Sequence, residues 1–213
     1  MNTDEIADEL VGSATTLRDE VADLSQLFGE TGFLGDCRNF PHAHFGYIMA
    51  CMSQIDLLSK CAYGEGEPKG GQTVRMRDFM MRYIDDQKSA EHRVAIKLFR
   101  HTLMHTGALR PIWEDDGTAY TWRVYFTDTM PQHCGHYTLT DEAMAFQHDF
   151  VHKILDLGTA IPTRIKSLNL LLPDFSRDIL RAAINYTTEM RQDPTLASKL
   201  EGVYPKLCAQ QLL

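Results

Sequence analysis

The sequence lacks a long apolar run, a signal-like start and a paired cysteine motif, and each absence excludes a class of protein. No stretch approaches the ~20 consecutive apolar residues that a membrane-spanning helix needs. The start, Met1 to Glu5, is acidic and lacks the basic residues and apolar run of a signal peptide. The five cysteines are scattered, with no CxxC pair, so no disulfide framework is expected. These features predict a cytoplasmic protein without a membrane segment.

Basic residues are also scarce. The chain has 21 Lys and Arg against 29 Asp and Glu, which gives a formal net charge of −8. A surface that coats nucleic acid broadly needs a basic excess to neutralise the phosphates. The charge therefore argues against such a surface, although a small basic cleft on an acidic protein remains compatible with it. With 44% hydrophobic and 23% charged residues, the 213-residue chain can form one well-buried core.

Hydrophobic periodicity predicts a mainly helical fold. In the first segment the apolar residues recur at near-helical spacing, and acidic residues fill the first turn, where the helix dipole favours them. A glycine-rich stretch over residues 63–73 is the clearest loop, and it is expected to join two helices. The predicted helices cover about residues 3–28, 43–62, 74–84, 88–107, 140–159, 163–172 and 176–191, with a loop at Pro173-Asp174 between the last two.

The period changes after Pro111. Residues 112–114 and 120–126 are aromatic and β-branched, and Asp115-Asp116-Gly117-Thr118 between them is typical of a hairpin turn. A third short strand is predicted near residues 136–139. The sequence therefore predicts a single mainly α domain over residues 1–213, a helical bundle with a small β-hairpin insertion at about residues 111–139.

The segment Arg100 to His105 carries the strongest chemical signal. It has an arginine, a histidine directly after it, and a second histidine five residues after the arginine, near the end of an apolar-patterned helix. This arrangement resembles the Arg-x4–6-His motif of the HEPN family (higher eukaryotes and prokaryotes nucleotide-binding), in which Arg100, His101 and His105 match the motif positions. Lys97 and Gly107, on either side, also resemble the segment in HEPN-like bacterial proteins. The resemblance implies a HEPN-like helical bundle.

The residue types suit the activity that the resemblance implies, metal-independent endoribonuclease cleavage that leaves a 2′,3′-cyclic phosphate. An arginine is always charged and binds phosphate oxygens in a fork, so Arg100 would hold the scissile phosphate. A histidine titrates near neutrality, so His105 would move the proton and His101 would orient or assist. No cofactor is expected. RNA or a nucleotide would be the ligand, whether the protein is catalytic or only binds.

Five residues of α-helix turn through about 500°, which leaves Arg100 and His105 roughly 140° apart around the helix axis. They converge if the helix end unwinds, or if two protomers contribute to one cleft. The second arrangement is common in the family, so the resemblance implies a homodimer. An antitoxin-type protein partner, as in toxin–antitoxin pairs, is a further implication.

Two other interpretations of these residues compete with the HEPN-like one. Arg100 and His105 could be a surface ion pair and a helix C-terminal histidine in a non-catalytic structural or partner-binding protein. His101, His105, His148 and His152 form two pairs with helical i, i+4 spacing that could hold a transition metal.

Two other groups of residues carry weaker chemical signals. The loop residues His133-Cys134-Gly135-His136 have no identifiable partner base for a reactive cysteine. The hairpin aromatics could stack on bases beside Arg123, or pack against the bundle. These aromatics are Tyr120, Trp122, Tyr125 and Phe126.

Overall fold

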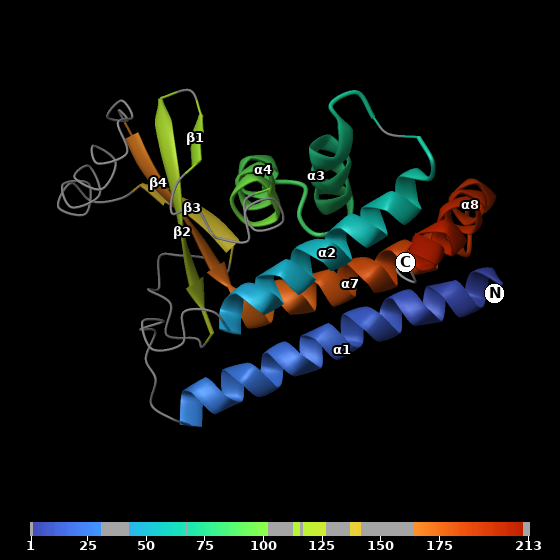
Figure 1. Ribbon diagram of the computed structural model, residues 1–213, viewed down its shortest axis with the longest axis horizontal. Helices are drawn as coiled ribbons and strands as arrows, with labels where there is room; N and C mark the ends of the chain where they lie inside the picture. Colours follow the sequence, from blue (N-terminus) through green and yellow to red (C-terminus); the bar gives the residue numbers. More distant parts are fainter. Residues whose placement is uncertain are drawn as a thin grey trace.

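The computed structural model describes residues 2–30, 43–66, 68–101, 113–115, 117–126, 137–141 and 164–210. Within these residues the protein is mainly helical with a small sheet, as the sequence predicts (Figure 1). The helices are α1 (Thr3–Glu30), α2 (Ala43–Tyr63), α3 (Gly71–Tyr83), α4 (Ser89–Ala95), the π-helical η2 (Ile96–His101), α7 (Leu172–Met190) and α8 (Pro194–Gln210). The strands are β1 (Trp113–Asp115), β2 (Thr118–Tyr125), β3 (Tyr137–Asp141) and β4 (Arg164–Leu171).

Three long helices form the body of the molecule. In Figure 1, α7 runs between α1 and α2, and α3 lies on the far side of α2 from α1. The apolar residues of α1 face the core, as their spacing predicts: Ile6, Leu10 and Val21 are at most 1% exposed. These residues join one hydrophobic core with residues from α2, α3, η2, α7 and the sheet. The start of α1 lies beside α8, where the Thr3 hydroxyl donates to Glu201.

The sheet has four strands in the order β1-β2-β4-β3. The predicted hairpin is present: β1 and β2 are antiparallel, with Gly117 between them at φ 71°. The predicted third strand is β3, which extends through Asp141, so a helix cannot begin at Thr140 as expected. The rest of that predicted helix lies outside the described residues. The hairpin does not stand alone, because β2 pairs in parallel with β4 and β4 pairs antiparallel with β3.

Strand β4 corrects the prediction of a helix over residues 163–172. The segment has apolar residues at 165, 168 and 172, a spacing that a helix would also produce. Because β4 is a central strand buried on both faces, its alternation of polar and apolar residues over 167–170 is short and runs into the apolar residues 170–172, which also fit a helix.

The C-terminal helices also differ from the prediction. Pro173 is not in a loop but in the first turn of α7, where its missing N–H costs no helical hydrogen bond. Helix α8 follows in a stretch where no helix or strand was predicted. It contains Gly202 and Pro205, residues that disfavour a helix interior, but Leu196, Leu200 and Tyr204 are at most 5% exposed. Burial of this apolar face therefore outweighs the local preference.

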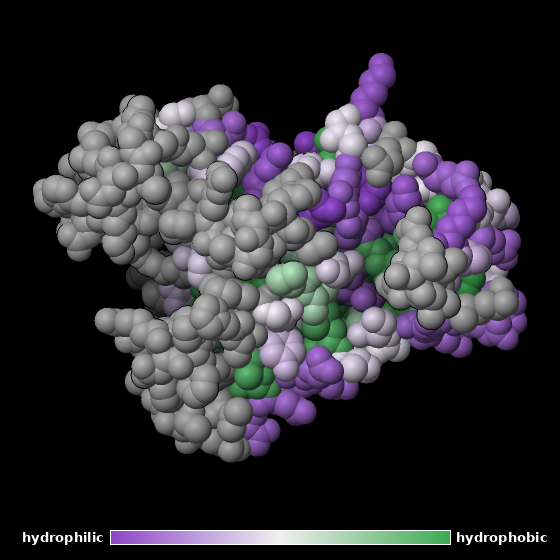
Figure 2. Space-filling view, in the orientation of Figure 1, coloured by the Kyte–Doolittle hydropathy of each residue, from purple (hydrophilic) through white to green (hydrophobic). Residues whose placement is uncertain are grey.

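The face of the helical part that Figure 2 shows is mostly hydrophilic. Figure 2 shows charged and polar side chains over α3 and around α8, with only small separate hydrophobic areas between them. Among the described residues, no helix is both long enough and apolar enough to cross a membrane.

Candidate functional site

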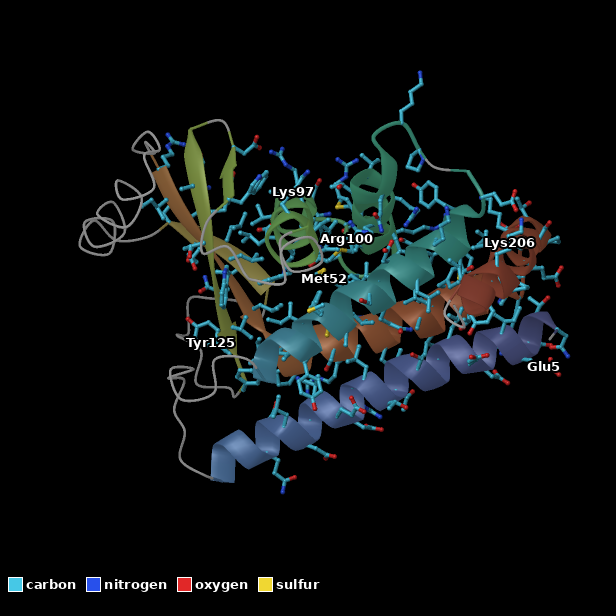
Figure 3. The ribbon with its side chains drawn as sticks, viewed as in Figure 1. Glu5, Met52, Lys97, Arg100, Tyr125 and Lys206 are labelled. Atoms are coloured by element: carbon cyan, nitrogen blue, oxygen red, sulfur yellow. The ribbon has the colours of Figure 1, made fainter. Side chains whose placement is uncertain are left out.

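Arg100 lies in η2, the π-helical continuation of α4, at the point where this segment approaches α2 and α3 (Figure 3). Its side chain is 12% exposed. A π-helical turn carries an extra residue relative to an α-turn, and such turns occur frequently at functional sites. The backbone of His101 closes the same segment, whereas its side chain lies outside the described residues, as does all of His105. The convergence of Arg100 and His105 on one cleft therefore stays a prediction.

The Arg100 guanidinium is tied to α2 through Asp56. Its Nη2 lies 3.5 Å from Asp56 Oδ2, the long limit for a hydrogen bond. The same carboxylate accepts a much shorter bond, 2.6 Å from Oδ1 to Arg75 Nη2. Gln72 Nε2 also donates to Asp56 Oδ2. Helices α2 and α3 thus hold the carboxylate, and Arg100 is its weakest partner.

Arg75 is the buried member of this cluster. Its side chain is 3% exposed, and its Nε donates to Ser59 Oγ at 3.2 Å, one turn along α2 from Asp56. The Ser59 hydroxyl in turn donates to the Asp56 backbone carbonyl at 2.8 Å. These bonds fix the Arg75 guanidinium on the carboxylate, since an unpaired buried charge would be costly. We refer to Asp56, Ser59, Gln72, Arg75 and Arg100 as the arginine cluster.

The arginine cluster contains two guanidinium groups and one carboxylate, so it keeps one unit of positive charge. Arg75 takes the better geometry, which leaves the charge of Arg100 incompletely neutralised. Arg100 Nε is buried and has no hydrogen-bond partner. A guanidinium has five N–H donors in a rigid fork, so Arg100 retains donors for an anion that reaches it.

Sequence reasoning identified Arg100 but missed the other members of the arginine cluster. The signal was available in α2, where Asp56 and Ser59 interrupt an otherwise apolar stretch around Ile55 and Leu58. Polar residues at such positions need buried partners, and these partners come from α3 and η2. The sequence does not show which residues of later helices those are, because that depends on how the helices cross.

His92, in α4, is a buried histidine that was not among the predicted site residues. It is 0% exposed, and its Nε2 lies 2.8 Å from the Asp85 carbonyl oxygen in the turn before the helix. Burial lowers the pKa of His92 below its ordinary value, because the charged imidazolium loses solvation. The neutral ring then connects α4 to the turn that follows α3.

The side chains of two cysteines are described, and both are buried in α2. Burial raises the pKa of the Cys51 thiol to about 12, so it stays protonated and unreactive at neutral pH. Cys61 is buried as well. The segment His133 to His136, with Cys134, lies outside the described residues.

Three of the hairpin aromatics, Tyr120, Trp122 and Phe126, pack within the protein. The Trp122 ring meets Phe99 of η2 edge-on at 6.1 Å between ring centroids, and Phe126 is 9% exposed. Tyr120 stacks on Trp113 at 5.1 Å, and the Arg93 guanidinium lies over Trp113. These contacts favour the packing interpretation over stacking on bases.

Among the residues that the structure describes, no group of three or more His, Cys, Asp or Glu side chains could hold a metal ion. The side chains of the alternative metal site, His101, His105, His148 and His152, all lie outside that part of the chain. Comparison with family models, curated proteins and solved structures found no match. The HEPN resemblance therefore rests on residues of this chain alone.

Proposed function

We propose that the protein binds RNA or a nucleotide at Arg100, as the HEPN resemblance implies. The observation that carries the proposal is the arginine cluster, in which Arg100 keeps an unpartnered Nε beside a carboxylate that Arg75 already neutralises. A phosphate oxygen is the ligand whose geometry matches a guanidinium fork. The local positive charge suits a phosphate even though the whole chain is acidic.

The enzymatic form of this proposal is metal-independent RNA cleavage. His105 would take the proton of the 2′-hydroxyl, whose oxygen then attacks the adjacent phosphorus. The P–O5′ bond breaks, the leaving 5′ oxygen takes the proton back from His105, and the products carry a 2′,3′-cyclic phosphate and a 5′-hydroxyl. Arg100 would stabilise the charge that develops on the phosphoryl oxygens, and His101 would orient or assist. No step calls for a metal ion.

A non-catalytic structural or partner-binding role is the second candidate. The observation that favours it is the Arg100–Asp56 ion pair, together with the low exposure of the Arg100 side chain, 12%. An arginine that serves only to pair with a carboxylate would show the same contact. In the first candidate function Arg100 binds RNA or a nucleotide, whereas in the second it binds only Asp56 of its own chain.

Cleavage of a labelled oligoribonucleotide in chelator separates these candidates. We expect wild-type protein to cut RNA but not the all-deoxy analogue, and His105→Ala to lose on the order of 10²- to 10⁴-fold in rate. Arg100→Ala should weaken both binding and rate, and Arg100→Lys should restore little, because a point charge does not replace the fork. Arg177→Ala is the matched control, since Arg177 is an exposed arginine on α7.

The structural role would be supported by a different result. Wild-type protein would then neither bind nor cut any RNA tested, while Arg100→Ala lowered the melting temperature. Chelator-sensitive cleavage would instead favour the histidine metal site, and stoichiometric metal lost on His148→Ala or His152→Ala would identify it.

A further inference from the structure

The solvent-accessible side of α4 and η2 is basic. Between His92 and Arg100, every side chain that is not buried is a lysine or an arginine. These side chains are Arg93, Lys97 and Arg100, and about one helical turn separates each from the next. We call these three residues the basic stripe. It begins in α4 and ends at the arginine of the proposed phosphate site.

The basic stripe is long enough for more than one phosphate. In Figure 3, Lys97 and Arg100 lie in the same region of the molecule, between the sheet and the pair of helices α2 and α3. Arg93 and Arg100 are seven residues apart, and a helical residue rises about 1.5 Å, so the stripe extends over about 10 Å. A nucleic-acid strand carries one phosphate per about 3.4 Å of helix axis. About two or three consecutive phosphates therefore match the length of the stripe.

Contacts from other elements hold both ends of the basic stripe. The Arg93 guanidinium lies over the Trp113 ring of β1, 5.4 Å from its centroid, and pairs with Asp115 at the end of the same strand. The Arg93 side chain is nevertheless 45% exposed, so an anion from solvent can reach it. Arg100, at the other end, is held by Asp56. Because both guanidinium groups are already positioned, binding of an anion costs less side-chain entropy.

The basic stripe fits a nucleic-acid strand better than a lipid surface. A helix that binds a lipid surface exposes apolar side chains as well as basic ones. The apolar side chains between His92 and Arg100 are instead all buried, and they are Val94, Ala95, Ile96, Leu98 and Phe99. Single strands of nucleic acid are bound by cations that follow the line of the backbone, which is the arrangement of the basic stripe.

We propose that Arg93 and Lys97 bind the phosphates next to the one at Arg100, so that the ligand is an RNA strand several nucleotides long and not a mononucleotide. The choice of RNA among polyanions of this kind rests on the proposed function. Each cation contacts a different phosphate, and binding weakens with salt because it releases counterions from the strand. Asp115 competes with the strand for Arg93 and thereby limits the affinity.

The test measures binding of a fluorescent 2′-O-methyl RNA about eight nucleotides long, which keeps the phosphates and lacks the hydroxyl that would attack them. Anisotropy with the full-length protein in chelator, from about 50 to about 200 mM salt, gives the affinity and its salt dependence. We expect log K against log salt to have a slope of about −2 for wild-type protein, since each contact with a single strand contributes about −0.7.

Single substitutions in the basic stripe should weaken this binding. Arg93→Ala and Lys97→Ala should each cost about two- to fivefold in affinity at the lowest salt and make the slope shallower by about 0.7. Asp115→Asn should tighten binding, because Arg93 then pairs with the strand alone. The matched controls are Arg177→Ala and Lys206→Ala, which remove an exposed cation from α7 and from α8. They change the net charge by the same amount and should bind as wild type does.

The outcomes separate this inference from the proposed function. If the strand binds through Arg100 while Arg93→Ala and Lys97→Ala bind as wild type does, only this inference is overturned. If these two variants weaken binding but Arg100→Ala does not, the proposed function fails while the phosphate contacts of Arg93 and Lys97 stand. Absence of strand binding overturns the inference, and a protein that still bound 5′-adenosine monophosphate would retain the proposed function. Binding to phosphatidylserine vesicles that both variants lose, without RNA binding, would assign the basic stripe to a lipid surface instead.

Discussion

At the residue scale, Asp56 determines how the two arginines of the site divide their roles. It gives its shorter contact, 2.6 Å, to the more deeply buried Arg75, and Arg100 approaches only to 3.5 Å. Arg75 is thereby a structural cation, whereas Arg100 keeps charge and donors for another partner. The two arginines thus differ in how freely they can bind another anion, and the difference follows from their burial and from their distances to the Asp56 carboxylate.

Removing that carboxylate tests this division of roles. Asp56→Ala should lower the free energy of unfolding by about 3 kcal/mol or more, because it leaves a buried guanidinium without its counter-charge. Arg177→Ala should cost less than about 1 kcal/mol, as removal of an exposed ion pair on α7 usually does. Urea unfolding followed by circular dichroism measures both. Equal, small losses would mean that Arg75 does not depend on Asp56.

The buried His92 makes the free energy of unfolding depend on pH. Burial holds the pKa of His92 below its ordinary value of 6.5, so the unfolded chain binds this proton more readily than the folded chain does. The resulting contribution to stability is present above about pH 6.5 and is lost as the pH falls towards the folded-state pKa. His92→Gln removes the titration. Between about pH 7.5 and about pH 5.5, its free energy of unfolding should fall less than that of wild type, and parallel losses would contradict this account.

At the element scale, the sequence predicted best where one face of an element meets the core and the other meets water. Helix α1 is such a case, since its buried positions Ile6, Leu10 and Val21 alternate with exposed acidic ones. The hairpin was also predictable, because Gly117 adopts the positive φ that its turn needs. Strand β4 was not, because its polar–apolar alternation covers only residues 167–170, and the apolar run over residues 170–172 fits either element.

The candidate site was also only partly predictable from the sequence. Arg100 was found because its motif is local in sequence, within Arg100 to His105. Asp56 and Arg75 were missed because their partnership joins three helices and depends on the crossing of α2 with α3 and η2. A short-range pattern identifies the candidate residue, whereas the residues that contact it are determined by the tertiary structure.

The turn between α2 and α3 offers a matched pair of glycines for an element-scale test. Gly70, just before α3, has φ 102°, and a Cβ there would lie 2.5 Å from Val74 Cγ2. Gly66 has open space around its Cβ position and no positive φ. Gly70→Ala should therefore cost about 1–3 kcal/mol, while Gly66→Ala should be neutral or slightly stabilising. Thermal and urea unfolding of the two variants compares them directly, and equal effects would be inconsistent with a strained turn at Gly70.

At the scale of the whole molecule, the proposed site lies away from the end where the chain starts. In Figure 3, Arg100 lies among the helices on the side near the sheet. Glu5 on α1 and Lys206 on α8 lie at the end of the molecule away from the sheet. That far end is held by contacts of its own, such as Arg191 to Asp4 at 3.1 Å. A second protomer that completes the site would therefore be expected to approach from the side of η2. If the site is shared between two protomers, light scattering should give a molar mass near twice 24.2 kDa.

Mixing two inactive variants tests whether Arg100 and His105 act across two protomers. In a symmetric dimer with shared sites, each site takes Arg100 from one protomer and His105 from its partner. A heterodimer of Arg100→Ala with His105→Ala then has one site with both residues intact and one with neither. Random mixing should restore about a quarter of wild-type activity, since half of the dimers are mixed and each has one working site. If both residues act within one protomer, every site keeps a defect, and the mixture stays as inactive as its components.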